Sequence, residues 1–414
     1  MNLLKTSVLN GIAVLIKTVT MFVINKILAV YVGPTGYAAI GQFQNFVQMA
    51  TTFAGSAINT AVIKYTAEYH KDESKQREIW KTAGSIVFLF SLIFTFLILI
   101  FQKQLSFYIF QSFKYQLVFV WFAVFLLFFN FNTLFLAILN GKKEIVKFVV
   151  ANIAGSLFSL TITSVLAIKY RLYGALIALS IYQSIAFFVT LLLCYKADWF
   201  KFSYLFGKID LGITKKFASF LLMALVSAIC VPLSQMLIRA YLTQEFGLAY
   251  AGYWEAMIRL SAAYLMLVTT TLGVYYLPRL SELNNIDEIK KEVYLGYKFI
   301  LPITILGGIV VFMLRDWIIT FLFSSSFLPM QDLFFWQLIG DTLKIGSWIL
   351  AYLMLSKAMT KLFIITEIIF ALSLIALTYI CTKFFGFEGV SIAYLINYGV
   401  YWIIMGLFVF KQLK

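Results

Sequence analysis

The sequence has little histidine, cysteine, proline or charge. Its 414 residues include one His, three Cys and five Pro, and only 12% are charged. One His leaves almost no material for a catalytic triad or a His-ligated metal, and we interpret His70 as a solvated loop residue. Cys194, Cys230 and Cys381 lie far apart without CxxC spacing, which argues against a disulfide framework or a zinc site.

Apolar residues dominate what remains. Hydrophobic residues make up 62% of the chain, against roughly 45–50% in soluble globular proteins, which excludes an ordinary water-soluble enzyme. A bilayer core needs about 20 mainly apolar residues per helix, and twelve runs meet that need, so the sequence predicts an all-α integral membrane protein. The predicted spans are 7–31, 37–62, 82–101, 117–140, 147–168, 173–195, 216–241, 251–276, 299–323, 331–356, 362–382 and 387–410.

The ninth of these spans is the least regular. Arg315 and Asp316 interrupt its apolar run, and three consecutive serines close it. We therefore expect a helix that is followed by a short tilted segment.

Basic residues predict the orientation of the chain. With the N-terminus inside, the inner segments carry 22 Lys and Arg and the outer connectors carry 5, so the positive-inside rule makes both termini cytoplasmic. The net charge of +15 is then explained by loops beside anionic headgroups, and no nucleic acid partner is expected. The inner segments are 1–6, 63–81, 141–147, 196–216, 277–298, 357–361 and 411–414.

The connector 196–216 divides the chain into two halves of six spans. Aromatic residues alternate with lysines along it, which is typical of a segment that lies in the membrane interface. We therefore expect an N-lobe over 1–195, a cytoplasmic interfacial linker over 196–216 and a C-lobe over 217–414.

Similar features recur at an offset near 213 and suggest a duplication. Gly41 corresponds to Gly252, and the pair Gln44 and Gln48 stands where Glu255 and Arg259 stand in the second half. Because six spans is an even number, both halves enter the membrane in the same direction. The repeat is therefore expected to be parallel, with a pseudo-two-fold axis along the membrane normal.

Charged residues within the predicted spans are the main functional clue. A charge at mid-bilayer costs roughly 2.5–3.5 kcal/mol on insertion scales, so such residues usually face a cavity or a partner. Apart from Lys147, Lys216, Asp332 and Glu388 in the first two positions of their spans, six cations and four anions lie in the spans, which leaves a positive excess. They are Lys17, Lys26, Arg239, Arg259, Arg315 and Lys344 on one side and Glu255, Asp316, Asp341 and Glu367 on the other.

Most of these charges have a structural explanation as well. Glu255 and Arg259 are spaced i,i+4, and Asp341 and Lys344 i,i+3, so each pair can neutralise itself along one helix face. Arg315 and Asp316 near a span end, like Lys26 and Arg239, can instead snorkel to the interface.

Lys17 has no such explanation. It lies about ten residues into its span, without any acidic residue on the same helix. Nine positions separate it from Lys26, which places the two on opposite faces. We therefore expect Lys17 to line a water-filled cavity.

A cationic cavity inside a bilayer suits an anion that crosses it, because ammonium and guanidinium groups bind phosphate oxygens. The chain contains no GxxxxGK[ST], GxSxG or HExxH segment. We therefore expect a transporter that is not an enzyme and uses no cofactor and no metal.

The order and spacing of several segments resemble the Wzx-type polysaccharide flippases, and in particular their enterobacterial-common-antigen branch. The resemblance covers essentially the whole chain. The segments are Asn25-Lys26-Ile27-Leu28-Ala29-Val30, Gly33-Pro34-Thr35-Gly36, Lys64-Tyr65-Thr66-Ala67-Glu68-Tyr69-His70, Tyr276-Leu277-Pro278-Arg279-Leu280-Ser281, Leu314-Arg315-Asp316 and Trp336-Gln337-Leu338-Ile339-Gly340-Asp341-Thr342-Leu343-Lys344.

The resemblance implies two six-helix lobes around a central cavity, as in multidrug and toxin extrusion proteins. It also implies that undecaprenyl-pyrophosphate-linked oligosaccharide moves from the cytoplasmic to the periplasmic leaflet of the bacterial inner membrane. Implied partners are membrane lipids, the polysaccharide polymerase and the chain-length regulator. Lys17, Lys26, Asp341 and Lys344 fall on matching positions, whereas Glu255 and Arg259 depart from the branch and hint at an O-antigen unit.

The sequence thus predicts one site of eight charged residues. Its substrate-binding cations are Lys17, Lys26, Arg239, Arg259 and Lys344, and its charge partners or coupling groups are Glu255, Asp341 and Glu367. Alternative functions are a multidrug-type cation antiporter of the same fold and a membrane-embedded polymerase or ligase. The first would prefer an acidic cavity, and the second would need a larger outer loop than this chain has.

Overall fold

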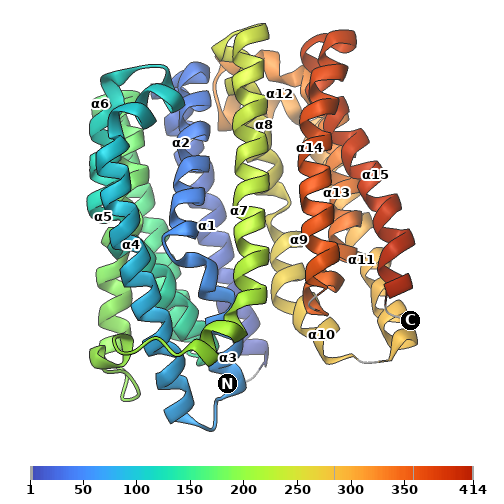
Figure 1. Cartoon of the computed structure of the whole chain (residues 1–414). Helices are drawn as coiled ribbons and strands as arrows, with labels where there is room; N and C mark the ends of the chain where they lie inside the picture. Colours follow the sequence, from blue (N-terminus) through green and yellow to red (C-terminus); the bar gives the residue numbers. More distant parts are fainter. Residues whose placement is uncertain (1–2, 284, 358, 413–414) are drawn as a thin grey trace. The chain divides into compact units, whose positions relative to one another are not determined.

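Helices make up nearly all of the structure (Figure 1). The computed structural model describes residues 3–283, 285–357 and 359–412, and it contains no β-strand within those ranges. The predicted inner segments 1–6, 277–298, 357–361 and 411–414 therefore lie partly outside the described residues.

The chain forms two compact units. Unit 1 comprises Met1–Val32 and Ala39–Pro232, and unit 2 comprises Gly33–Ala38 and Leu233–Lys414. The division falls at Pro232, inside the helix Leu211–Phe246, and the lobe boundary in the linker 196–216 stays a prediction.

Long helices connected by short turns build each unit. Unit 1 contains α1 (Leu3–Tyr31), α3 (Asn59–Glu68), α4 (Glu73–Phe110), α5 (Gln116–Gly141), α6 (Ile145–Tyr195) and the short helices η1 (Ser56–Ile58), η2 (Phe113–Tyr115) and η3 (Phe202–Leu205). Two helices have residues in both units, α2 (Gly33–Phe53) and α7 (Leu211–Phe246). Unit 2 contains α8 (Leu248–Tyr264), α9 (Met266–Thr271), η4 (Leu272–Tyr276), α10 (Leu277–Glu282), α11 (Ile286–Met313), α12 (Arg315–Leu322), η5 (Ser325–Leu333), α13 (Phe334–Ser356), α14 (Thr360–Phe385), η6 (Gly386–Glu388) and α15 (Gly389–Gln412).

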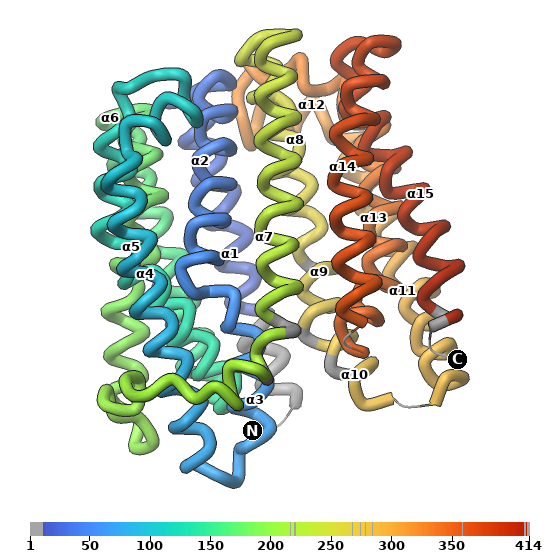
Figure 2. The backbone as a smooth tube through the Cα atoms, viewed as in Figure 1, coloured from blue at the N-terminus to red at the C-terminus, as the bar shows by residue number. Residues whose placement is uncertain are grey.

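The predicted span 37–62 is not one continuous helix. It breaks between α2 and α3 with a bend of 69° (Figure 2). Gly55 has a φ of 132° at the break, and a Cβ there would lie 2.9 Å from the Cα of Val87, so glycine alone fits. The carbonyl oxygen of Ala54, which the break frees, accepts hydrogen bonds from Ser91 Oγ at 2.9 Å and Asn130 Nδ2 at 3.1 Å. The break was not predictable because it depends on these contacts with α4 and α5.

Two other breaks lie where the sequence predicts them. Arg171 divides α6 with a φ of 52° and a ψ of −131°, between the predicted spans 147–168 and 173–195. The 51 residues of α6 would otherwise form a rod about 76 Å long, more than twice the thickness of a bilayer core. At Leu314, α11 gives way to α12, which is the predicted short segment after a helix. Arg315 at this break is partly exposed and stacks on Phe312 at 4.5 Å.

The chain is a multi-pass membrane protein. Eight helical stretches of the described residues are long and apolar enough to cross a membrane, or nine if the bent pair of α2 with η1 and α3 is one span. Two of the eight stretches are about 50 residues long and each hold two of the predicted spans, Ile145–Tyr195 and Thr360–Val409. All twelve predicted ranges lie on helices, while the exact number of crossings stays a prediction.

Three connectors of unit 1 pack together at one end of its helices. Lys142 after α5 donates to Gln76 Oε1 of α4 at 3.1 Å and lies over the rings of Trp80 and Trp199. Trp199 of the linker donates in turn to Glu144 Oε1 at 3.0 Å. These are three of the connectors predicted to lie on the same side of the membrane, and within unit 1 they do lie together, while the side that they face stays a prediction.

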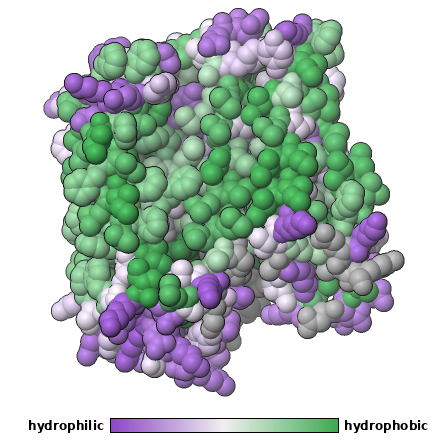
Figure 3. Space-filling view, in the orientation of Figure 1, coloured by the Kyte–Doolittle hydropathy of each residue, from purple (hydrophilic) through white to green (hydrophobic). Residues whose placement is uncertain are grey.

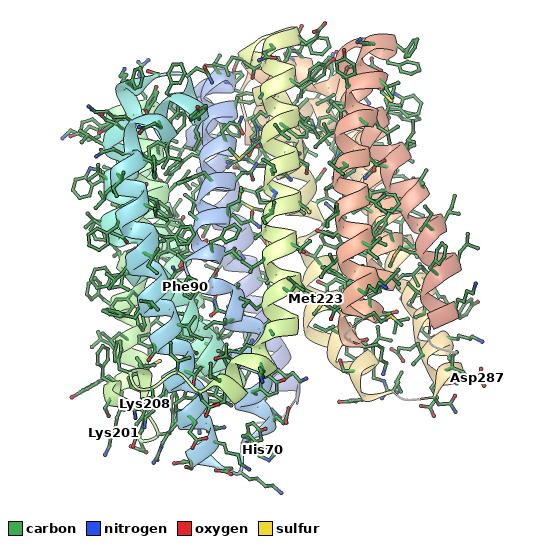
Figure 4. All side chains as sticks on the ribbon, viewed as in Figure 1. His70, Phe90, Lys201, Lys208, Met223 and Asp287 are labelled. Atoms are coloured by element: carbon green, nitrogen blue, oxygen red, sulfur yellow. The ribbon has the colours of Figure 1, made fainter. Side chains whose placement is uncertain are left out.

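The surface of unit 1 agrees with a membrane band. Over α4 to α6, apolar residues form a continuous region with hydrophilic residues beyond both of its ends (Figure 3). Exposed polar residues gather at the end that holds the linker, including His70, Lys201 and Lys208, while Phe90 and Met223 lie farther along α4 and α7 (Figure 4).

Unit 2 is built around aromatic contacts and close helix packing. Tyr37, from the start of α2, is fully buried against the rings of Phe323 and Phe327 at 6.0 and 5.1 Å. α8 approaches the same segment so closely that a Cβ on Gly252 would lie 1.8 Å from the oxygen of Pro34.

Equivalent features support the predicted repeat. The helices that carry the second span of each half end at Phe53 and Tyr264, 211 residues apart, which is also the separation of Gly41 and Gly252. The side chains of Asp72 and Asn285, 213 residues apart, each accept a backbone hydrogen bond at the start of a long helix.

Candidate functional site

Three of the predicted charges form one cluster in unit 2. Glu255 on α8 accepts a hydrogen bond from Arg239 Nη2 of α7 at 2.6 Å and another from Arg259 Nε of its own helix at 2.8 Å. Charge-assisted hydrogen bonds of this kind are short and strong. With two arginines on one carboxylate, the Arg239–Glu255–Arg259 cluster keeps a net charge of +1.

The two arginines differ in exposure. Only 1% of the Arg239 side chain is exposed, against 14% for Arg259. Arg239 stacks over Trp254 at 5.5 Å, and Arg259 stacks over Tyr37 at 5.2 Å. Arg239 is therefore buried with Glu255, while Arg259 is the most exposed member of the cluster.

Asp341 on α13 lies at the centre of a second cluster, in which it is fully buried. Ser261 Oγ and Tyr264 OH of α8 donate to its Oδ2 at 2.6 and 2.8 Å. Tyr394 OH of α15 donates to its Oδ1 at 2.9 Å, and Gln337 Nε2 lies 3.4 Å from the same oxygen. A buried carboxylate needs several donors, and three helices supply them here.

Lys344 lies one turn beyond Asp341 and is half-buried. The two side chains do not form an ion pair within 4.0 Å, so the i,i+3 spacing does not bring about direct pairing. Instead the Lys344 ammonium lies over the rings of Trp348, Tyr394 and Tyr398, at 4.8, 5.7 and 5.5 Å from their centroids. Such cation–π contacts stabilise a charge away from bulk water.

The remaining predicted residues lie outside these two clusters. Lys17 and Lys26 lie on α1 in unit 1, Lys17 exposed and Lys26 half-buried. Glu367 is half-buried on α14 in unit 2. The structure therefore places Arg239, Glu255 and Arg259 together, and Asp341 near Lys344, while the participation of Lys17, Lys26 and Glu367 in the same site stays a prediction.

The sequence analysis missed the neutral residues that hold these charges. Ser261, Tyr264 and Tyr394 bind Asp341, and Trp348 and Tyr398 complete the rings around Lys344. A signal was present, because Tyr394 and Tyr398 are spaced i,i+4 on the last predicted span and so share a helix face.

The accessible groups of the two clusters are cationic. The residues described contain no group of three or more His, Cys, Asp or Glu that could hold a metal ion. What the clusters offer is a partly accessible guanidinium and a ring-bound ammonium, both of which favour anionic ligands.

Comparisons with known protein sequences match most of this chain. A sequence model described as "Polysaccharide biosynthesis protein" matches residues 3–284. Two relatives, the lipid III flippases of Escherichia coli (strain K12) and Shigella flexneri, are each 30% identical over 406 residues, which covers 97% of this chain and 96% of the relative.

Solved structures share the fold. An inward-facing multidrug resistance MATE family transporter of the MOP superfamily superposes with a TM-score of 0.74 at 13% identity, over 96% of this chain and 94% of that chain. A MOP superfamily transporter from Pyrococcus furiosus, described as having a binding pocket of reversed polarity, gives a TM-score of 0.66 at 14% identity, over 97% and 95% of the two chains. At these identities the likeness concerns the fold alone.

Proposed function

Since the chain belongs to the polysaccharide biosynthesis protein family, we propose that it is a flippase for lipid-linked oligosaccharide. Its substrate would be an undecaprenyl-pyrophosphate-linked O-antigen or common-antigen repeat unit, moved from the cytoplasmic to the periplasmic leaflet. Relatives that are called lipid III flippases and match along 97% of this chain support the proposal.

The observation that carries this proposal is the Arg239–Glu255–Arg259 cluster. It retains one positive charge where α8 meets α7, a helix that is long and apolar enough to cross a membrane, and its more exposed member is a guanidinium. A guanidinium binds phosphate oxygens through two parallel hydrogen bonds. In this proposal Arg259 binds the diphosphate, and Lys344 adds a second cation in the same unit.

The multidrug-type cation antiporter is supported less well. An organic amine would need a carboxylate that is open to it, whereas Glu255 is bound by two arginines and Asp341 by three hydroxyl groups. Both carboxylates would have to give up these donors before they could bind an amine.

The mechanism in this proposal is alternating access of two six-helix lobes around a central cavity. The diphosphate binds the cations, the glycan occupies the aqueous part, and the polyprenyl tail stays in the lipid. Lys17 and Lys26 line the cavity from α1, and Glu367 takes part as a charge partner or in coupling. The protein catalyses no reaction, lies in the inner membrane with both termini in the cytoplasm, and works beside the polysaccharide polymerase and the chain-length regulator.

Membrane potential favours the outward direction. Moving one elementary charge across a membrane is worth about 2.3 kcal/mol per 100 mV. A doubly charged diphosphate that leaves the negative cytoplasm therefore gains roughly 4–5 kcal/mol at 100 mV. In this account the potential alone biases the transport cycle.

Purified protein in liposomes tests the proposal. We expect it to flip a fluorescent undecaprenyl-pyrophosphate glycolipid, and to do so faster when the imposed potential is negative on the side of origin. Arg259→Gln should lose this activity, while the matched exchange Arg315→Gln at the partly exposed start of α12 should retain it. Flipping no faster than in protein-free liposomes would refute the flippase, and rates that ignore the sign of the potential would refute only the electrical drive.

A further inference from the structure

Unit 1 contains an open cavity of about 250 Å³ among its helices. One face of α2 lines it, together with Phe129 of α5 and with Leu179 and Tyr182 of the second half of α6. The volume lies just below the roughly 300–1,000 Å³ of pockets that enclose drug-sized ligands. It therefore suits one ring of a larger molecule rather than a whole oligosaccharide.

The face of α2 that lines the cavity is polar. Gln44, Val47, Gln48 and Thr51 follow the spacing i, i+3, i+4 and i+7, which places all four on one side of the helix. A helix that packs in an apolar bundle normally turns its apolar stripe inward. Thr51 Oγ1 donates to Val47 O of its own helix at 2.8 Å, so Gln44 and Gln48 are the side chains that suit this face to water or a polar ligand.

A chain of hydrogen bonds between α5 and α6 ends at the hydroxyl group of Tyr182. Gln183 Nε2 donates to the Tyr182 hydroxyl at 3.4 Å, and Gln183 Oε1 accepts from Asn132 Nδ2 at 2.7 Å. Asn132 Oδ1 in turn accepts from Thr190 Oγ1 at 2.7 Å. A chain of amides and hydroxyls between α5 and α6 thus fixes the aromatic ring at the wall of the cavity, which is the kind of support that a preorganised binding site needs.

The chemistry of the lining selects for a neutral polyol. The lining residues include no Lys, Arg, Asp or Glu, so neither a phosphate nor an amine finds a counter-charge there. Glutamine amides both donate and accept hydrogen bonds, as sugar hydroxyl groups do. The rings of Phe129 and Tyr182 add apolar surfaces against which the C–H face of a sugar can pack.

We propose that this cavity is a glycan subsite, which takes one sugar residue of the lipid-linked oligosaccharide. The inference rests on the proposed function. It adds that the two halves of the repeat divide the substrate between them. Gln44 and Gln48 stand at the repeat positions of Glu255 and Arg259, so the same helix face recognises sugar in unit 1 and diphosphate in unit 2.

Binding of two lipids by the purified full-length protein tests the subsite. The probes are undecaprenyl pyrophosphate without sugar and undecaprenyl pyrophosphate that carries a neutral trisaccharide. We expect the wild type to bind the sugar-bearing probe at least about fivefold more tightly, and Gln48→Leu and Tyr182→Leu to lose most of this preference. The matched control Gln102→Leu should keep it, because Gln102 on α4 lies outside the cavity lining and donates to Leu99 O of its own helix.

Chemical labelling at position 48 tests whether sugar binds in this cavity. Gln48 is exposed, so a thiol introduced by Gln48→Cys should react with a maleimide. The sugar-bearing lipid, and free trisaccharide at high concentration, should slow this reaction, while bare undecaprenyl pyrophosphate should not.

The outcomes separate the subsite from the flippase. A preference for the sugar-bearing lipid that persists in both cavity variants, or that is absent from the wild type, would overturn the subsite. An equal loss of affinity for both lipids in the variants would overturn it as well. If neither lipid binds more tightly than undecaprenol, the proposed function fails. Protection of Gln48→Cys by free trisaccharide would then still support a sugar site, and its absence would refute one.

Discussion

The two units place different chemistry on equivalent helix faces. In unit 1, α2 presents Gln44 and Gln48 to an uncharged cavity, whereas in unit 2, α8 presents Glu255 and Arg259 to Arg239 of α7. Both helices end at matching positions, after Phe53 and Tyr264. The helices α2 and α8 therefore hold equivalent places in the repeat, while the side chains on their inward faces differ.

The difference shows how a duplicated fold can recognise a substrate with two unlike parts. A charged cluster inside a membrane protein is expensive to bury and selects for opposite charge, whereas amides and aromatic rings select for hydroxyl groups and apolar ring faces. In the proposed function a lipid diphosphate that carries a glycan presents both chemistries, the diphosphate to unit 2 and a sugar to unit 1.

Neutralising the carboxylate of unit 2 should have the largest effect. Glu255→Gln leaves Arg239 and Arg259 side by side without their shared anion, and breaking a buried ion pair costs about 3–5 kcal/mol. We expect a large loss of folded protein in the membrane and of transport, measured by immunoblot and by glycolipid flipping. The double variant Glu255→Gln/Arg239→Gln should recover abundance, and a single variant that behaves like the wild type would contradict the cluster's role.

Replacing Lys17 of α1 should have the next largest effect. Lys17 is an exposed cation on the first helix of unit 1. If it lines the substrate path, Lys17→Ala should abolish glycan export while its abundance in the membrane stays normal, and Lys17→Arg should retain part of the activity. Normal export by the alanine variant would remove Lys17 from the site.

Transplanting the charges of unit 2 into unit 1 should have a moderate effect. Gln44→Glu with Gln48→Arg builds the i,i+4 pair of α8 onto α2. We expect the preference for sugar-bearing over bare lipid to fall about fivefold, which corresponds to about 1 kcal/mol, with binding of the bare diphosphate lipid maintained or tightened. An unchanged sugar preference would show that the α2 face does not contact glycan.

The smallest expected effect concerns the helix caps of the two units, which should differ in how their stability depends on pH. Asp72 accepts a hydrogen bond from Lys75 N at the start of α4, and Asn285 accepts one from Asp287 N at the start of α11. The backbone hydrogen bond from Lys75 lowers the pKa of Asp72 below its ordinary value near 3.8. A lowered pKa means that the cap stabilises the fold above the ordinary pKa and loses its effect as the pH falls through the lowered one.

Hydrogen exchange at these two helix starts measures the difference. Between pH 6 and pH 3, protection of the first turn of α4 should fall relative to that of α11, whose asparagine cap does not titrate. Asp72→Asn should remove the pH dependence while keeping the cap. A parallel loss of protection in both helices would contradict the assignment to Asp72.

The local features of the fold were accessible from the sequence, and those that depend on distant segments were not. The breaks at Arg171 and Leu314 interrupt apolar runs, so composition predicts them. The break at Gly55 depends on Val87, Ser91 and Asn130, which lie more than 30 residues away in the chain.

The same distinction applies to the site. The pairing of Glu255 with Arg259 follows from their spacing on one helix, α8. Arg239 binds Glu255 from a different helix, α7. Asp341 finds its donors at Ser261 and Tyr264, 80 and 77 residues earlier, rather than at Lys344 one turn away. A charge pair at i,i+3 is only one of many partners open to a buried carboxylate, and packing decides among them.

The affinity of purified protein for undecaprenyl pyrophosphate, with and without the Arg259 guanidinium, tests the central claim most directly. A charge-assisted hydrogen bond contributes about 1.5–3 kcal/mol, so Arg259→Gln should weaken binding about tenfold or more. Binding of neutral undecaprenol should be weak in both proteins. Equal affinity of the wild type and the variant for the diphosphate lipid would contradict the account.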